Sequence, residues 1–139
     1  MRYFTVKEAN DFVPALSAAF SDIERLRLKI LRLTFELSDL GASTNLDQPV
    51  GRATPEPIRA RRCEIDEAVR KIRGVVGELE AHGVIVKGLD GAVDFRSLRA
   101  HRPVFLSWHR GEDHVQQWHE AWTDAPQPID GHFPKPLLN

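Results

Sequence analysis

The sequence predicts an α+β fold. It comprises a long, coiled-coil-like antiparallel helical hairpin, then a small antiparallel β-sheet of three or four strands and an extended, proline-rich C-terminal tail. Two long segments carry apolar residues at seven-residue spacing, short β-type runs separated by turns follow Gly83, and prolines gather after Trp122. With 139 residues, of which 42% are hydrophobic, the length and composition predict a single domain over residues 1–139.

The first predicted helix covers residues 5–40. Thr5 can cap the free amides of the first turn while Glu8 reaches back to the Thr5 amide, which is a capping box. Pro14 predicts a kink, and Gly41 suits the end of the helix. The apolar stripe that should face a neighbouring helix consists of Leu16, Ala19, Ile23, Leu26, Ile30, Leu33, Leu37 and Leu40.

A second helix is predicted over residues 55–82, with prolines at its start, where the amides have no helical partner. Its apolar stripe contains Ile58, Ile65, Ile72 and Leu79. The connection at 41–54 is longer than usual between bundle helices, so we expect a mobile tip. It is either a tolerated disordered loop or a loop that binds a partner or acts as a lid. Gly74 and Gly77 indicate close approach of another backbone or unselected weak points.

Antiparallel pairing of the two helices agrees with their charges. Placing Ile30 opposite Ile65 brings basic residues of the first helix level with acidic residues of the second, and Glu36 near Arg59. Apolar residues remain outside the paired stripes, and they require another cover. They are Phe20, Leu28, Leu31, Phe35, Val69 and Val76. We expect the C-terminal third and a second copy of the chain to cover them, which predicts a homodimer through the helices.

Residues 84–119 predict a β meander. Val84–Val86 and Val93–Phe95 flank the turn at Leu89-Asp90-Gly91, and Val104–Trp108 and Val115–His119 form a further hairpin. Residues 120–139 predict the extended tail, because repeated prolines disfavour regular structure.

Several ordered motifs carry a family resemblance over residues 2–129. The chain resembles the DUF2203 family of uncharacterised bacterial proteins, a resemblance that implies a fold and no established activity. It departs from the family pattern at Ser107, where cysteine is frequent, at His109, and at Ala125-Pro126-Gln127-Pro128, which lacks an arginine. The motifs are Tyr3-Phe4-Thr5-Val6-Lys7-Glu8-Ala9-Asn10, Pro14, Gly83-Val84-Ile85-Val86-Lys87, Val93-Asp94-Phe95, Leu106-Ser107-Trp108, Gly111-Glu112 and Trp118-His119.

Asp94, Glu112 and His119 match the family positions that could support chemistry. Two carboxylates and an imidazole would suit Zn²⁺, Mn²⁺ or Fe²⁺, with His109 and His114 as alternative ligands, although their spacing is not a metal signature. The structural interpretation is that Asp94 accepts backbone hydrogen bonds, Glu112 closes a turn and His119 is hydrogen-bonded at the sheet edge.

Aromatic and basic residues give two further candidate binding sets. Trp108 and Trp118 are expected to close the core, or alternatively to form an exposed stacking platform. Arg96, Arg99 and Arg102 fall within seven residues and either bind a small anion or form a solvated face.

No catalytic motif is present, and the activity stays open. The 19 basic and 20 acidic residues disfavour a nucleic-acid partner, no run suits a signal peptide or a membrane span, and Cys63 alone excludes an internal disulfide. We therefore expect a cytoplasmic, self-associating interaction or scaffold module, with an unknown protein partner as a further option. A metal-dependent hydrolase using Asp94, Glu112 and His119 and a small-anion binder are the alternatives.

Overall fold

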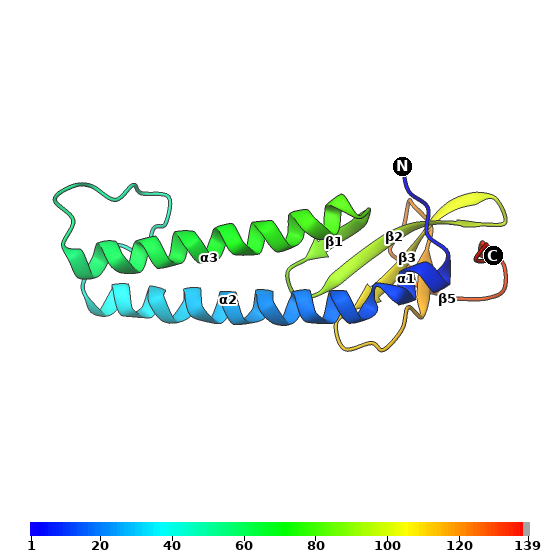
Figure 1. The fold of residues 1–139 in the computed structure, drawn as a ribbon, viewed down its shortest axis with the longest axis horizontal. Helices are drawn as coiled ribbons and strands as arrows, with labels where there is room; N and C mark the ends of the chain where they lie inside the picture. The colour runs from blue at the N-terminus through cyan, green and yellow to red at the C-terminus, as the bar shows by residue number, and fades with distance from the viewer. Residues whose placement is uncertain (138–139) are drawn as a thin grey trace. The chain divides into compact units, whose positions relative to one another are not determined.

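The computed structural model describes residues 1–137, which form three helices followed by a five-stranded sheet (Figure 1). The elements are α1 (Val6–Asp11), α2 (Val13–Asp39), α3 (Glu56–Ala81), β1 (Val84–Gly88), β2 (Ala92–Arg99), β3 (Arg102–His109), β4 (Gln117–His119) and β5 (Gln127–Pro128). They divide into two compact units, Asp22–Val75 and the remainder, and the single domain over 1–139 stays a prediction. No helix within residues 1–137 is long and apolar enough to cross a membrane.

The first predicted helix is broken at Phe12 rather than kinked near Pro14. Thr5 and Glu8 form the predicted capping box, with Thr5 Oγ1 accepting from the Glu8 amide at 2.9 Å and Glu8 Oε1 accepting from the Thr5 amide at 2.9 Å. Pro14 is the second residue of α2. A new helix begins there because a first-turn residue needs no helical amide partner, so proline is tolerated at that place.

The unit Asp22–Val75 is an antiparallel helical hairpin. Its core contains Leu33, Leu37 and Ile65, with Ile30, Ile58 and Val69 packed against it. Lys29 lies 3.8 Å from Glu64, which agrees with the predicted pairing of the helices. Glu36 pairs with Arg61 at 3.8 Å instead of with Arg59. The predicted stripe of α2 is buried or half-buried as far as Leu37, with Ala19 and Ile30 half-buried, while Leu40 is exposed beyond the end of the helix.

Arg59 turns away from Glu36 because it binds the connecting loop. Its Nη2 donates to the carbonyl oxygens of Arg52 at 2.7 Å, Gly51 at 3.3 Å and Thr54 at 3.4 Å. Arg62, which is 7% exposed, donates through Nη2 to the carbonyl oxygens of Leu46 at 3.1 Å and Gln48 at 2.5 Å. Two arginines of α3 therefore hold the 41–54 connection by its backbone.

Gly74 and Gly77 face open space within the part of the chain that the structure describes. A Cβ atom added at either position would meet nothing within 4 Å among the residues described. Close approach of another backbone within the chain is thus not the reason for these two helical glycines.

The other unit contains the sheet, with strand order β1-β2-β3-β4-β5 and antiparallel pairing throughout. One face packs against α1 and the beginning of α2. Phe4 meets Phe95 edge-on at a ring-centroid distance of 4.9 Å, and Phe20 lies 6.2 Å from Trp108. The sheet thus covers Phe20, one of the apolar residues left outside the predicted helix pairing.

The fifth strand lies inside the predicted tail. Gln127 pairs with Trp118 and Pro128 with Gln117. Pro128 is tolerated because a strand at the edge of a sheet need not donate from every amide. The last two residues of the predicted tail, Leu138 and Asn139, lie outside the described residues.

Candidate functional site

The sheet register gathers polar side chains on the face opposite the helices. Asp94 of β2 pairs with Ser107 of β3, and the next residue pair on that face is Phe105 with His119 of β4. Side chains of cross-strand partners lie on the same face of an antiparallel sheet. The register therefore brings Asp94, Ser107 and His119 together from three strands.

Asp94 and His119 form a buried pair. His119 Nε2 lies 3.0 Å from Asp94 Oδ2, and the two side chains are 8% and 7% exposed. Ser107 Oγ donates to the other carboxylate oxygen, Oδ1, at 2.9 Å. The imidazole stacks on Phe105 with a centroid distance of 5.3 Å. Both oxygens of the buried carboxylate thus have partners, as burial of a charge requires.

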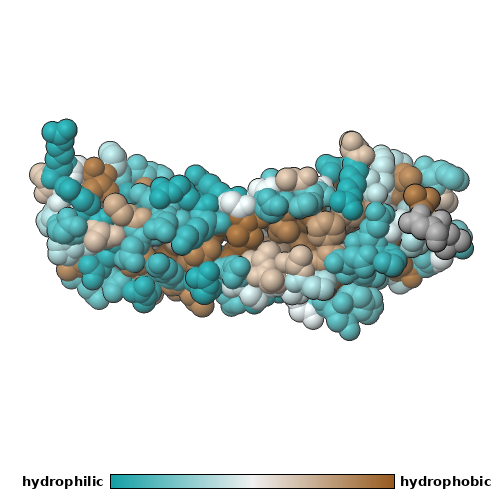
Figure 2. Space-filling model, viewed as in Figure 1, coloured by the Kyte–Doolittle hydropathy of each residue, from teal (hydrophilic) through white to brown (hydrophobic). Residues whose placement is uncertain are grey.

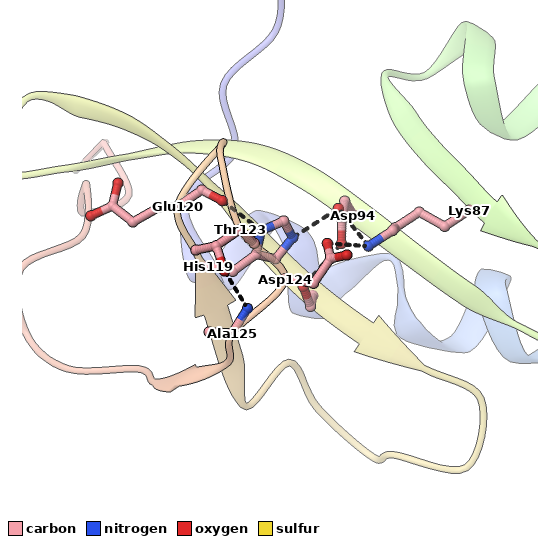
Figure 3. A network of polar contacts seen from close by, with 8 residues as sticks. Lys87, Asp94, His119, Glu120, Thr123, Asp124 and Ala125 are labelled. Carbon is pink, nitrogen blue, oxygen red and sulfur yellow. Dashed lines mark hydrogen bonds and ion pairs between the residues drawn. The ribbon is translucent and has the colours of Figure 1, made fainter.

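Lys87 connects this pair to the segment after β4 (Figure 3). Its Nζ lies 3.6 Å from Asp94 Oδ2 and 3.4 Å from Asp124 Oδ1. Partial burial lowers the pKa of Lys87, but attraction to Asp94 and Asp124 outweighs it and leaves the pKa raised. The network therefore alternates cations and carboxylates between β1, β2, β4 and the turn at residue 124.

His119 also holds the chain that follows it. Its Nδ1 lies 2.8 Å from the carbonyl oxygens of both Glu120 and Thr123 (Figure 3). Carbonyl oxygens only accept, so Nδ1 carries a proton. The Asp94 carboxylate also faces the Lys87 ammonium and accepts hydrogen bonds. A hydrogen bond from His119 Nε2 to this carboxylate therefore needs a second proton, on Nε2. All three contacts of the ring are hydrogen bonds when His119 is an imidazolium.

The electrostatics agree with this assignment. Burial disfavours the charged ring and lowers the pKa of His119. The hydrogen bonds to the Glu120 carbonyl, to Asp94 and to the Thr123 carbonyl, with the attraction of Asp94, outweigh burial and raise the pKa above its usual 6.5. Below that pKa, His119 is positively charged, and its hydrogen bonds link the carbonyls of Glu120 and Thr123 to Asp94 of β2.

The arrangement does not suit nucleophilic catalysis. In a serine–histidine–aspartate triad, the imidazole lies between the hydroxyl and the carboxylate, so that it can take the hydroxyl proton. Here Asp94 lies between Ser107 and His119, and both ring nitrogens of His119 are engaged. In this arrangement the three side chains connect β2, β3 and β4 by hydrogen bonds.

Glu112 does not join Asp94 and His119. Its Oε1 accepts from the His109 amide at 2.7 Å, and its carbonyl oxygen accepts from Trp108 Nε1 at 3.0 Å, so it closes the turn between β3 and β4. Over residues 1–137, no three histidine, cysteine, aspartate or glutamate side chains form a group that could hold a metal ion. The structure brings together two of the three predicted ligands.

His109 and His114 each pair with a separate aspartate. His109 Nε2 lies 3.2 Å from Asp90 Oδ2, and His114 Nδ1 lies 2.5 Å from Asp113 Oδ1. Hydrogen bonds to the Arg110 carbonyl and to Asp90 raise the pKa of His109. Its side chain is 55% exposed, so solvent screens these interactions.

Trp108 and Trp118 are 2% and 7% exposed, so they are core residues. Trp118 Nε1 donates to the Pro128 carbonyl at 3.1 Å, which ties β5 to β4. Its ring carries the guanidinium of Arg99 at 4.6 Å from the centroid. These contacts use the tryptophans for packing rather than for an exposed stacking platform.

The arginines proposed for anion binding have carboxylate partners. Arg99 pairs with Asp130 at 2.7 Å, and Arg102 pairs with Glu120. The hydrogen bond from Arg99, followed by that from the His132 amide, lowers the pKa of Asp130 to about 2. The backbone carbonyl of Arg96 accepts from the Phe4 amide at 2.7 Å.

Sequence reasoning missed Lys87, Ser107 and Asp124 as members of the network. Strand alternation could have found Lys87, because it follows Ile85 by two residues and Ile85 pairs with Asp94. No local signal marks Asp124, which reaches Lys87 only through the path of the chain after β4.

Comparison with known proteins identifies a family and nothing more specific. The family model described as "Uncharacterized conserved protein (DUF2203)" matches residues 2–124. No curated protein and no solved structure matches the chain. The match spans every element from α1 to β4 together with the polar network around His119, and the chain therefore belongs to the DUF2203 family.

Proposed function

We propose that this protein is an interaction module that self-associates through an exposed apolar stripe on α2. One observation carries the proposal. Leu28, Leu31 and Phe35 are 59%, 52% and 64% exposed although they lie in the middle of a long helix. Their spacing of three and four residues places them on one face. That face is separate from the face that packs against α3.

The stripe borders a surface groove. The groove has a volume of about 460 Å³ and is lined by Glu24, Arg27, Leu28, Ile30, Leu31 and Thr34. Apolar residues lie among hydrophilic ones along the helices on the face shown in Figure 2. Contiguous exposed apolar surface with a polar rim is typical of sites where proteins associate.

A second copy of the chain is the occupant that the charges favour. Both signs border the stripe, with Arg25, Arg27 and Arg32 against Glu24 and Asp39. A two-fold interface uses the same surface twice, so it must be complementary to itself. A surface that carries both signs meets this condition, whereas a surface of one sign would repel its copy.

Sedimentation equilibrium tests the proposal with one charge placed in the stripe. We expect the wild type to be dimeric at micromolar concentration and Leu31→Glu to be monomeric with unchanged circular dichroism. The matched control is Leu89→Glu, which alters an exposed leucine in the turn between β1 and β2 and should leave the dimer intact. A monomeric wild type, or equal effects of the two substitutions, would show that the stripe does not mediate self-association.

A further inference from the structure

Resting on the proposed self-association, we infer that the two copies pair antiparallel through α2, with Leu31 of each chain against the partner's Phe35. The seven-residue spacing of the stripe supports this inference. Leu28 and Phe35 repeat at seven residues, and Glu24, Leu31 and Ser38 form the intervening series. When two helices pair side by side, residues of the two series alternate along the interface and form successive layers of contacting side chains.

Parallel pairing is disfavoured by like charges. It would place Glu24 against the partner's Glu24 inside the apolar layer series. It would also place Arg27 beside the partner's Arg32, twice by symmetry, because residues five apart face each other across a parallel pair. Like charges in contact destabilise an interface, so the charge pattern selects the antiparallel arrangement.

The charged residues along one edge of the stripe decide between the possible antiparallel registers. Arg25, Arg32 and Asp39 lie along that edge, because seven residues are close to two helical turns. If Leu31 meets the partner's Phe35, then Arg25 meets the partner's Asp39, and symmetry repeats the pair. Arg32 then lies against its own symmetry copy at the two-fold axis, while each Arg32 also pairs with Glu36 of its own chain at 3.2 Å. This register therefore makes one contact between arginines, where parallel pairing makes two and adds the contact between the two Glu24 side chains.

A shift of one layer is less favourable. If Leu28 met the partner's Leu31, then Glu24 would lie against the partner's Phe35 and Arg25 against the partner's Arg32. The inferred register avoids both contacts, because Glu24 then extends past the end of the partner's helix, which is Asp39.

A charge exchange tests the register. Arg25→Glu and Asp39→Arg each create like-charged pairs twice, so each should raise the dimer dissociation constant about 3- to 10-fold at low salt. The double substitution restores opposite charges and should return the constant to within about 2-fold of wild type. Lys71→Glu, on an exposed side chain of α3, is the control and should change nothing.

Cross-linking provides a second measurement. In a Cys63→Ser background, Thr34→Cys should give a covalent dimer under mild oxidation, because Thr34 lies beside its own symmetry copy in this register. Asp22→Cys should not, because it lies far from the axis.

The outcomes separate the register from the proposed function. A dimer that Leu31→Glu dissociates, but that the double exchange leaves as weak as the single variants, would overturn the register and retain self-association. A monomeric wild type would overturn both the register and the proposed self-association.

Discussion

Replacing His119 with glutamine should destabilise the fold, and the loss should depend on pH. Glutamine can donate to Asp94 or to the carbonyls of Glu120 and Thr123, but its single amide cannot reproduce all three contacts, and it carries no charge. Asp94 stays buried, with Lys87 at 3.6 Å as its remaining cation. Removing one partner of a buried charged pair costs about 3–5 kcal/mol. Because Lys87 remains, we expect about 2–3 kcal/mol near pH 6.

The direction of the pH dependence follows from the raised pKa of His119. The folded state binds the proton more tightly than the unfolded chain, whose histidine has a pKa of about 6.5. The stabilisation is therefore complete below about pH 6.5 and is lost as the pH rises through the higher pKa of the folded state. The difference in unfolding free energy between wild type and His119→Gln should be largest near pH 6 and should shrink by about pH 9.

Urea unfolding of both proteins between about pH 5.5 and 9 measures this difference. His114→Gln is the control, because that side chain is exposed and pairs with the exposed Asp113; its effect on the unfolding free energy should stay within about 0.5 kcal/mol. Nitrogen-15 NMR of the imidazole should show both ring nitrogens of His119 protonated near neutral pH. A difference that does not vary with pH, or a ring protonated only at Nδ1, would refute the reasoning.

Four further substitutions test the fold by thermal denaturation. Gly91→Ala should lower the unfolding free energy by about 1–3 kcal/mol, because Gly91 has a φ of +114° and an added Cβ would overlap Arg110. Gly111→Ala should lower it less, because Gly111 has a φ of +103° but open space around an added Cβ. Equal losses for the two variants would show that the overlap with Arg110 does not matter. Thr5→Ala should lower the unfolding free energy by about 1 kcal/mol, because it removes the capping box, and an unchanged melting temperature would contradict this expectation. Gly74→Ala should stabilise α3 by about 0.5–1 kcal/mol, because nothing lies within 4 Å of the added Cβ; destabilisation would indicate an unseen neighbour.

The helices and their pairing could be predicted because local signals determine them. Apolar residues at seven-residue spacing predicted the side of α2 that packs inward. Opposite charges predicted the register of the helix pair, in which Lys29 lies near Glu64. The break at Phe12 was not predicted, because Pro14 is compatible both with a kinked helix and with the first turn of a new one. Arg59 was paired with the wrong partner because its true contacts are carbonyls, which every residue carries.

The sequence by itself determined the fold class, the capping box, the turn at Leu89-Asp90-Gly91 and the family. Each depends on residues close together in the chain or on a repeated spacing. Only the tertiary structure decided that Asp94 and His119 meet while Glu112 does not. That outcome depends on the pairing of β2, β3 and β4 and on the path of the chain after His119. A shift of one residue in register would turn His119 to the opposite face of the sheet, so the spacing of these residues in the sequence could not reveal the pair.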